Sequence, residues 1–290
     1  VLDDEGRIIA VFVGTPEDPG WPDVIAEVVA VLTEAHEAAL TSEAVSASDE
    51  HHRRGDFLPF AVGLSHGGGQ SRPGILLHSK RLRPIVQRIM KNKSVRRVCG
   101  FQSSSFFNFA PKVAGDYIKN LKPIFERDPT LQHNFSNSIF LTVTFNCGPR
   151  TATFEHLDFN NRPDGFCAIM CGGQFNHRLG AHLYLKQLRL VVEFPSGATA
   201  LIPSGTVDHS NTPLQAGETR CSITQYAAGA LFRWSGYGFK NGKQLLRERG
   251  GAERKAAFDG APGERAQAGL ERFSKVAELA ADHASVIATL

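Results

Sequence analysis

The sequence predicts an α+β fold in which helices flank a double-stranded β-helix, or jelly-roll, core. Two observations predict this fold. From Ser138 onward, short apolar or alternating runs recur between Gly, Pro and Asn residues at a spacing typical of jelly rolls and β-barrels. Before Ser138, longer segments carry apolar residues at helical spacing. The chain has 290 residues, 42% of them hydrophobic and 21% charged, so it can bury a sizeable core.

Residues 1–137 are predicted to form a mixed, mainly helical N-terminal part. Its expected elements are a strand at 7–13, a helix capped by Asp23, a polar loop at 42–56, and helices at 80–92 and 112–127. His66–Gln70 is rich in glycine but lacks the lysine and Ser/Thr of a phosphate loop. We interpret it as a flexible segment, or as one that approaches a ligand closely.

Residues 138–240 are predicted to form the jelly-roll core, and residues 241–290 a linker and a C-terminal helix. The expected strands of the core are 139–145, 151–156, 166–171, 182–185, 190–194, 199–202 and 219–226. Residues 241–268 are charged and rich in Gly and Ala, which is typical of a linker. Glu271–Leu290 has the pattern of an amphipathic helix.

The cysteines and apolar stretches exclude several classes of protein. The chain has five cysteines and no C-x-x-C pair: Cys99, Cys147, Cys167, Cys171 and Cys221. This pattern argues against a disulfide framework or zinc cluster and favours reduced, intracellular thiols. The longest apolar stretches, Val24–Leu32 and Leu190–Phe194, are too short to span a membrane, and no signal segment opens the chain. We therefore expect no membrane partner.

A basic stripe runs through residues 80–97, although the net charge of the chain is only +3. The stripe has eight cations and no acidic residue: Lys80, Arg81, Arg83, Arg88, Lys91, Lys93, Arg96 and Arg97. Concentrated positive charge on a nearly neutral protein is typical of nucleic-acid binders, whose cations contact backbone phosphates. A solvated helix face explains the stripe equally well, so charge alone leaves both interpretations open.

His156, Asp158 and His209 are predicted to form a metal centre. In a strand, residues i and i+2 point to the same face, so His156 and Asp158 can direct an imidazole and a carboxylate to one point. His209 follows Asp158 by 51 residues (209 minus 158) and lies in a polar turn. Two histidines and one carboxylate are the ligand set of non-haem Fe(II) oxygenases, and they leave coordination positions open. For an isolated H-x-D motif, a surface histidine and a solvated aspartate would be the simpler interpretation.

Arg220 is the predicted binding residue for a carboxylate. It lies inside an apolar strand, 11 residues after His209, and a buried guanidinium needs an anionic partner. Ser222 shares its strand face, so both are expected to bind the distal carboxylate of 2-oxoglutarate, whose other end would chelate the iron. Arg150 and His182 are candidate partners for the inner carboxylate. The alternative is an exposed Arg220 on an edge strand.

Residues 138–240 resemble the catalytic core of the TET/JBP family of 2-oxoglutarate- and Fe(II)-dependent nucleic-acid dioxygenases, in its fungal branch. The matching segments are Thr144–Arg150, His156–Asp158, His209–Asn211, Gly217–Arg220, Thr224–Tyr226 and Leu231–Trp234. Gly67–Gln70 and Phe101–Ser105 are also similar to that branch. The resemblance implies oxidation of the methyl group of 5-methylcytosine in DNA, stepwise to hydroxymethyl, formyl and carboxyl forms. In some fungal relatives it extends to demethylation of N6-methyladenine.

The resemblance also implies roles in base recognition. Asn161, three residues after Asp158, would hydrogen-bond a base flipped out of the duplex, and Tyr226, six residues after Arg220, would stack on it. A turn-forming Asn161 and a core Tyr226 are the alternatives.

One position departs from the family pattern. Better-known relatives have a histidine two residues after the stacking aromatic, where this chain has Ala228. This difference puts strict recognition of cytosine in doubt. Asp164 could accept a hydrogen bond from the exocyclic amine of either cytosine or adenine. Turn formation by Pro163-Asp164-Gly165 explains Asp164 equally well.

Taken together, these features predict a DNA dioxygenase that uses Fe(II), 2-oxoglutarate and O₂. The chain lacks the cysteine-rich zinc region of animal family members, so the basic stripe is the candidate for contacts with the DNA backbone. The expected partner is double-stranded DNA with a modified base, and we expect a monomer in the nucleus. The alternatives are an oxygenase of the same scaffold that acts on RNA or protein, and an inactive reader of modified DNA.

Overall fold

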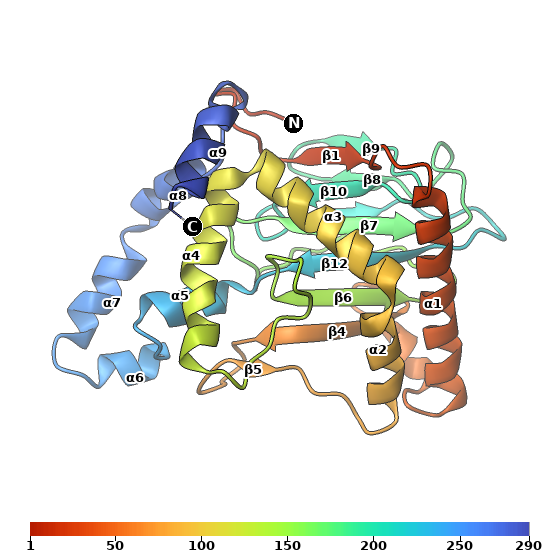
Figure 1. The fold of residues 1–290 in the computed structure, drawn as a ribbon, viewed down its shortest axis with the longest axis horizontal. Helices are drawn as coiled ribbons and strands as arrows, with labels where there is room; N and C mark the ends of the chain where they lie inside the picture. The colour runs from red at the N-terminus through yellow and green to blue at the C-terminus, as the bar shows by residue number, and fades with distance from the viewer. Residues whose placement is uncertain (290) are drawn as a thin grey trace.

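The computed structural model describes residues 1–289 and is built on two sheets (Figure 1). The larger sheet has seven strands in the order β1-β10-β7-β12-β6-β4-β5, with antiparallel neighbours. In chain order these strands are β1 Val11–Gly14, β4 Leu58–Ser65, β5 Gly74–Ile75, β6 Thr142–Cys147, β7 Cys167–Gly172, β10 Thr199–Ile202 and β12 Cys221–Tyr226. The smaller sheet, in the order β11-β8-β9, consists of β8 Leu183–Leu185, β9 Leu190–Val192 and β11 His209–Asn211.

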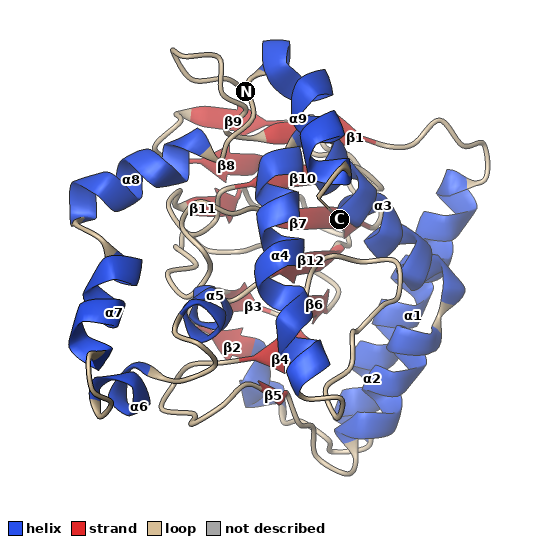
Figure 2. Cartoon of the chain, turned by 60° about the vertical axis from the view of Figure 1, so that its left-hand side comes forward, coloured by secondary structure: helices blue, strands red, loops and turns tan. Residues whose placement is uncertain are grey.

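Helices cover one face of the larger sheet, as Figures 1 and 2 show for α1, α3 and α4. The four helices of the first half are α1 Trp21–Thr41, α2 Leu82–Lys91, α3 Lys93–Phe109 and α4 Pro111–Arg127. The predicted apolar face of α1 is buried, and it packs with Val86 and Ile89 of α2 in one core cluster. The helices and antiparallel sheets confirm the predicted α+β class.

Strand alternation separates a helix-facing side of the larger sheet from a cavity-facing side. On β6 and β12, alternate side chains join the core beneath α1, α2 and α3: Val143, Phe145, Cys147, Cys221 and Ile223. The residues between them line a cavity on the other side: Thr144, Asn146, Ser222, Thr224 and Tyr226. The period of two in a strand thus places Thr144, Asn146, Ser222 and Thr224 on the face away from the helices, whereas Gln225 faces α3 and donates to the Cys99 carbonyl.

The smaller sheet packs against that second face. Leu183 and Leu185 of β8 join a core cluster with Cys167, Ile169 and Cys171 of β7. The cavity lies beside this cluster and is lined from both sheets, because Leu183 and His209 border it together with Ile169. Two packed antiparallel sheets are consistent with the predicted jelly roll.

The predicted boundary at residue 137 does not separate two folding units. β1 pairs with β10, and β4 pairs with β6, so strands from residues 1–137 complete the same sheet as the predicted core. The strand predicted at 7–13 is β1, shifted to Val11–Gly14. No helix among residues 1–289 is both long and apolar enough to cross a membrane.

Several segments differ from the sequence prediction. The polar loop at 42–56 contains the short helix η1 Ala47–Glu50 and a hairpin of β2 His51–His52 and β3 Gly55–Asp56. α3 was not predicted, because its serine-rich second half has a weak apolar pattern. The predicted linker at 241–268 is helical, and Glu271–Leu290 is not one helix, although residue 290 lies outside the described residues. The C-terminal elements are α5 Gly229–Gly236, α6 Gly242–Leu246, α7 Gly251–Asp259, α8 Pro262–Glu271, η2 Val276–Glu278 and α9 Leu279–Ile287.

Candidate metal centre and its cavity

The three predicted metal ligands converge at one point. His156 and His209 pair through their backbones, with N–O distances of 3.1 and 3.0 Å, and their ring centroids are 4.3 Å apart. Nε2 of each ring lies 3.9 Å from an oxygen of the Asp158 carboxylate. All three potential ligand atoms lie within 4.8 Å of one another. Residues 151–156 are not a regular strand, so this backbone pairing, rather than the predicted strand, aligns the two histidines.

Both histidines present a ring nitrogen to the cluster. Nδ1 of His156 donates to the Phe154 carbonyl at 2.8 Å, and Nδ1 of His209 donates to the Val207 carbonyl at 3.0 Å. A neutral imidazole that donates from Nδ1 keeps a lone pair on Nε2, which is the form that ligates a metal. Burial lowers the pKa of His156 to about 4, and the nearby His209 adds to this effect. At neutral pH, His156 is therefore unprotonated.

The carboxylate of Asp158 fits a bound cation. Asp158 is buried, and its Oδ1 atom has no partner in hydrogen-bond geometry among residues 1–289, although Arg54 Nη2 approaches it to 2.6 Å. A buried anion needs a counter-ion, and among residues 1–289 only Arg54, whose side chain is partly exposed, supplies one. A divalent ion such as Fe(II) would satisfy the carboxylate and both imidazoles, and it would keep coordination positions free.

Arg220 is buried without a counter-ion. Its side chain is 2% exposed, and Nη1 donates to the Thr151 carbonyl at 2.7 Å and to Asn211 Oδ1 at 3.3 Å. Nε has no partner, and no ion pair within residues 1–289 includes this guanidinium. Ser222 borders the same cavity, and its Oγ atom accepts a hydrogen bond from Asn146 Nδ2 at 2.9 Å. The arrangement offers a desolvated cation and a hydroxyl to an anionic ligand.

Arg150 and His182, the predicted partners of the inner carboxylate, do not border the cavity. The Arg150 guanidinium instead donates to the carbonyls of Leu214 and Gln215 at 3.1 and 2.9 Å. His182 Nδ1 pairs with Thr212 Oγ1 at 3.0 Å. The local contacts of each side chain direct it away from the metal ligands.

Arg54 is the cation that the sequence prediction missed. It lies in the turn between β2 and β3, and the hairpin reaches the metal loop because the Phe154 amide donates to the Arg54 carbonyl at 2.7 Å. The Arg54 side chain is 39% exposed and pairs with Asp158 across more than a hundred residues of sequence. The only sequence signal was the basic run His51-His52-Arg53-Arg54 in a polar segment.

Two of the three predicted base-binding residues border the cavity. The ring of Tyr226 lines it, and the hydroxyl pairs with Thr144 Oγ1 at 3.3 Å. Asn161 also lines it, but its Nδ2 atom lies 3.1 Å from Ser204 Oγ, 3.2 Å from Cys167 Sγ and 3.4 Å from Asp158 Oδ2. The amide group of Asn161 is therefore directed towards the metal loop, and only Oδ1 remains for a base.

Asp164, the third predicted base-binding residue, lies outside the cavity. Its carboxylate forms ion pairs with Arg162 at 2.7 Å and with Arg272 at 2.5 Å, and the residue does not border the cavity. Burial alone would raise the pKa of Asp164, but the hydrogen bonds from Arg162 and the charges of Arg162 and Arg272 together outweigh burial, so the pKa is lowered. Asp164 anchors α8 to the loop after the metal ligands.

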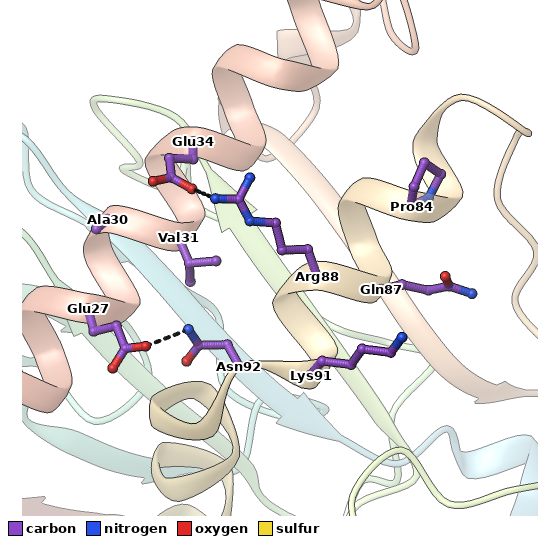
Figure 3. A pocket seen from close by; sticks show the side chains of 9 residues that line it. All are labelled: Glu27, Ala30, Val31, Glu34, Pro84, Gln87, Arg88, Lys91 and Asn92. Carbon is purple, nitrogen blue, oxygen red and sulfur yellow. Dashed lines mark hydrogen bonds and ion pairs between the residues drawn. The ribbon is translucent and has the colours of Figure 1, made fainter.

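The basic stripe lies on the helix-covered side of the sheet, away from the cavity. α2 and the start of α3 carry it, and they pack with α1 on the face opposite to Ser222 and Tyr226. Three of its arginines form ion pairs with acidic residues: Arg81 with Glu43, Arg88 with Glu34, and Arg97 with Asp18. Figure 3 shows Arg88 reaching across the groove between α2 and α1. A DNA strand whose base enters the cavity would therefore have to pass around the edge of the sheet to contact the stripe.

The cavity that holds these groups, here called the main cavity, has a volume of about 620 Å³. Asp158 is the only acidic residue that borders it. Four arginines also border it: Arg53, Arg54, Arg220 and Arg233. The glycine-rich loop also lines it through His66, Gly67 and Gly68, and Phe159 lies beside the opening with 66% of its surface exposed. The opening is thus positively charged and carries an exposed aromatic ring.

Comparisons with solved structures show the fold. The chain is similar to NgTET1 in complex with 5mC DNA, with a TM-score of 0.53 and 12% identity over 78% of this chain and 75% of that one. This likeness shows a shared fold with a protein that bears the predicted family name.

Weaker likenesses are to an oxidoreductase of the 2OG-Fe(II) oxygenase family from Burkholderia pseudomallei and to a prolyl-4-hydroxylase from Pseudomonas putida. The first has a TM-score of 0.33 and 14% identity over 73% of this chain and 92% of that one. The second has a TM-score of 0.29 and 14% identity over 76% and 92%. No protein-family model and no curated protein matches the chain.

Proposed function

We propose that the protein is an Fe(II)- and 2-oxoglutarate-dependent dioxygenase that oxidises the methyl group of 5-methylcytosine in DNA. One observation carries the proposal: the His156, Asp158 and His209 cluster shares a cavity with Arg220, a buried cation without a counter-ion. A metal site with open positions beside a carboxylate-binding site suits a cosubstrate that chelates the metal and has a second acidic end. The shared fold with NgTET1, whose structure contains 5mC DNA, supports the choice of DNA.

The proposal gives each group of the cavity a role. His156, Asp158 and His209 would hold Fe(II), which with 2-oxoglutarate and O₂ supplies the oxidising chemistry. Arg220 and Ser222 would bind the distal carboxylate. Arg54, in place of Arg150 and His182, would meet the inner carboxylate, because it is the cation nearest to Asp158.

The remaining wall of the main cavity would receive the base. Tyr226 offers an aromatic face, and base stacking is worth roughly 1–3 kcal/mol, which offsets much of the cost of extrusion from a duplex. Asn161 Oδ1 is free to accept a hydrogen bond from the exocyclic amine of cytosine. Asp164 has no part in this proposal, because its carboxylate pairs with Arg162 and Arg272 and lies outside the cavity.

The DNA backbone would follow the arginines at the opening rather than the basic stripe. Arg53 and Arg233 border the cavity and form no ion pair within residues 1–289. Phosphate contacts position a duplex and make its affinity depend on salt. A DNA substrate would place the protein in the nucleus, and a single chain contains every group named above, in keeping with a monomer.

Mass spectrometry of digested nucleic acid tests this function. Duplexes with 5-methylcytosine or N6-methyladenine, methylated RNA, and a protein extract are each incubated with the protein, Fe(II) and 2-oxoglutarate. We expect oxidised methylcytosine and an equal amount of succinate. Oxidised RNA or protein, with unchanged DNA, would assign the substrate to those classes. Tight DNA binding with no succinate would indicate a reader of modified DNA.

A further inference from the structure

A second cavity lies next to the main cavity, at the junction of α4, α5 and the loop before β5. It has a volume of about 330 Å³, close to the lower end for small-ligand sites. The end of α4 supplies Arg127 and Asp128, α5 supplies Trp234, and Arg72 comes from the loop. α4 and α5 lie side by side in both ribbon views (Figures 1 and 2).

The lining of the second cavity combines aromatic rings with unpaired cations. Trp234 and Phe239 are partly exposed, and the Arg127 guanidinium lies 4.9 Å from the centroid of the Phe239 ring. Arg72 and Arg127 are exposed and form no ion pair within residues 1–289. Asp128 is the only acidic residue of the lining, and its Oδ1 atom already accepts hydrogen bonds from the amide and the hydroxyl of Thr130.

This combination matches the chemistry of a nucleotide. Aromatic side chains stack on any base, because every base has a π-face, and unpaired arginines attract phosphate. An apolar ligand would leave Arg72 without a partner and Arg127 with the Phe239 ring alone, and an acidic peptide would leave the aromatic rings unused. Two arginines against one carboxylate leave a net positive charge in the lining, which favours an anionic ligand with an aromatic group.

The two cavities are separated by one layer of side chains. His66 lines the main cavity, and its ring packs edge-on against Trp234 with centroids 5.1 Å apart. Helix α5 contributes to both sites, because Ala230 and Arg233 border the main cavity while Trp234 borders the second. A nucleic-acid strand that leaves the main cavity past Arg233 therefore reaches the second cavity within one turn of α5, because Trp234 is the next residue of the helix.

We propose that the second cavity binds one unpaired nucleotide of the strand whose modified base enters the main cavity. Its base lies against Trp234 and Phe239, and its phosphate lies between Arg72 and Arg127. The proposal rests on a nucleic-acid substrate and deepens it: the bound strand is unpaired at a second position beside the target base. A duplex substrate would therefore be opened at this second position as well as at the target base.

Tryptophan fluorescence reports directly on this site. The chain has two tryptophans, and Trp21 is buried in α1 with its indole nitrogen donating to the Gly197 carbonyl at 3.1 Å. In a Trp21→Phe background, emission comes from Trp234 alone. If that variant fails to fold, the difference between the unsubstituted chain and Trp234→Phe isolates the same signal. The probe is a short single-stranded oligothymidylate, with a fluorescein-labelled copy for anisotropy.

We expect Trp234 emission to be quenched over the same concentration range in which anisotropy rises. Trp234→Ala should weaken binding roughly 5- to 100-fold, since it removes one stacked base. Arg72→Gln and Arg127→Gln should each lower the slope of log affinity against log salt by about 0.7, the loss of one phosphate contact on a single strand. Arg249→Gln is the matched control, because it removes an exposed arginine outside both cavities.

Two results would overturn the inference. A rise in anisotropy with unchanged Trp234 emission means that the strand bypasses the second cavity, and the proposed function is then unaffected. No binding of the oligothymidylate in either measurement also overturns it. Turnover of methylated duplex, measured separately, then decides whether the proposed function fails with it.

Discussion

Replacing Arg220 with methionine tests two effects of this buried cation separately: its effect on the stability of the ligand-free protein and its effect on the affinity for 2-oxoglutarate. The guanidinium is 2% exposed and lacks a counter-ion within residues 1–289, and burial of an unpaired ion costs several kcal/mol. Asn211 Oδ1 also accepts from Thr153, so only the Thr151 carbonyl would lose its donor, at a cost of about 1–3 kcal/mol. The variant without ligand should therefore unfold at the same temperature as the original protein or a higher one.

Binding of 2-oxoglutarate should show the opposite effect. Removal of one partner from a buried, hydrogen-bonded charge pair costs roughly 2–5 kcal/mol, which corresponds to a rise in Kd of roughly 30- to 4000-fold. At a ligand concentration of about 100 times Kd, the original protein gains about 2.7 kcal/mol, or roughly 5–10 °C in Tm for a chain of this size. Arg220→Met should lose most of this gain.

Thermal unfolding with Mn(II), a redox-inert substitute for Fe(II), measures both quantities with and without 2-oxoglutarate. Arg178→Met is the matched control, because Arg178 is exposed and lies outside the main cavity. A variant that keeps the full 2-oxoglutarate-dependent shift would show that Arg220 does not bind the carboxylate. A large fall in Tm without ligand would refute the argument that the unpaired charge is costly.

Four further predictions follow from particular contacts. His156→Ala should abolish the visible absorption bands of bound Co(II), measured by titration, and unchanged bands would remove His156 from the ligand set. Ser204→Ala removes one of the hydrogen-bonding partners that hold Asn161 beside Asp158, so metal affinity should fall roughly 10- to 100-fold with little change in Tm. Arg233→Gln should lower the salt dependence of DNA binding by about one phosphate contact, whereas Arg88→Gln should not; the reverse would return the interface to the basic stripe. Burial lowers the pKa values of several histidines outside the metal cluster: His52, His66, His78 and His133. The unfolded chain then binds protons more readily, so the urea midpoint should be constant above the ordinary histidine pKa of 6.5 and fall as the pH drops below it.

The corrections to the predicted site share one physical cause. Arg150, Asp164 and the basic stripe were assigned by residue type, but Arg150, Asp164 and three arginines of the stripe have partners that the sequence does not display. Asp164 pairs with Arg272, which lies 108 residues later in the sequence, and Arg88 pairs with Glu34, which lies 54 residues earlier. The largely buried pair of Asp164 with Arg162 satisfies both charges within the fold. The exposed pairs of the stripe are weak, so its position on the helix-covered side of the sheet is what separates it from the cavity.

The sequence by itself determined the chemistry that the protein can support. The short spacing in His156-Leu157-Asp158, the polar turn at His209 and an arginine inside the apolar run at 219–226 were sufficient, because ligand type and local period are properties of neighbouring residues. The same local patterns predicted α1, α2, α4 and most strands of the larger sheet.

Only the tertiary structure decided which other groups face that chemistry. Arg54 approaches Asp158 because the β2–β3 hairpin lies against the metal loop, and the second cavity exists because α4, α5 and the loop before β5 meet. These are contacts between segments far apart in the chain, and their free energy comes from packing that no local pattern encodes. Tertiary packing also decided on which side of the larger sheet each cation lies. The helices that carry the basic stripe pack against one face, and the cavity with Arg54 and Arg220 lies on the other face.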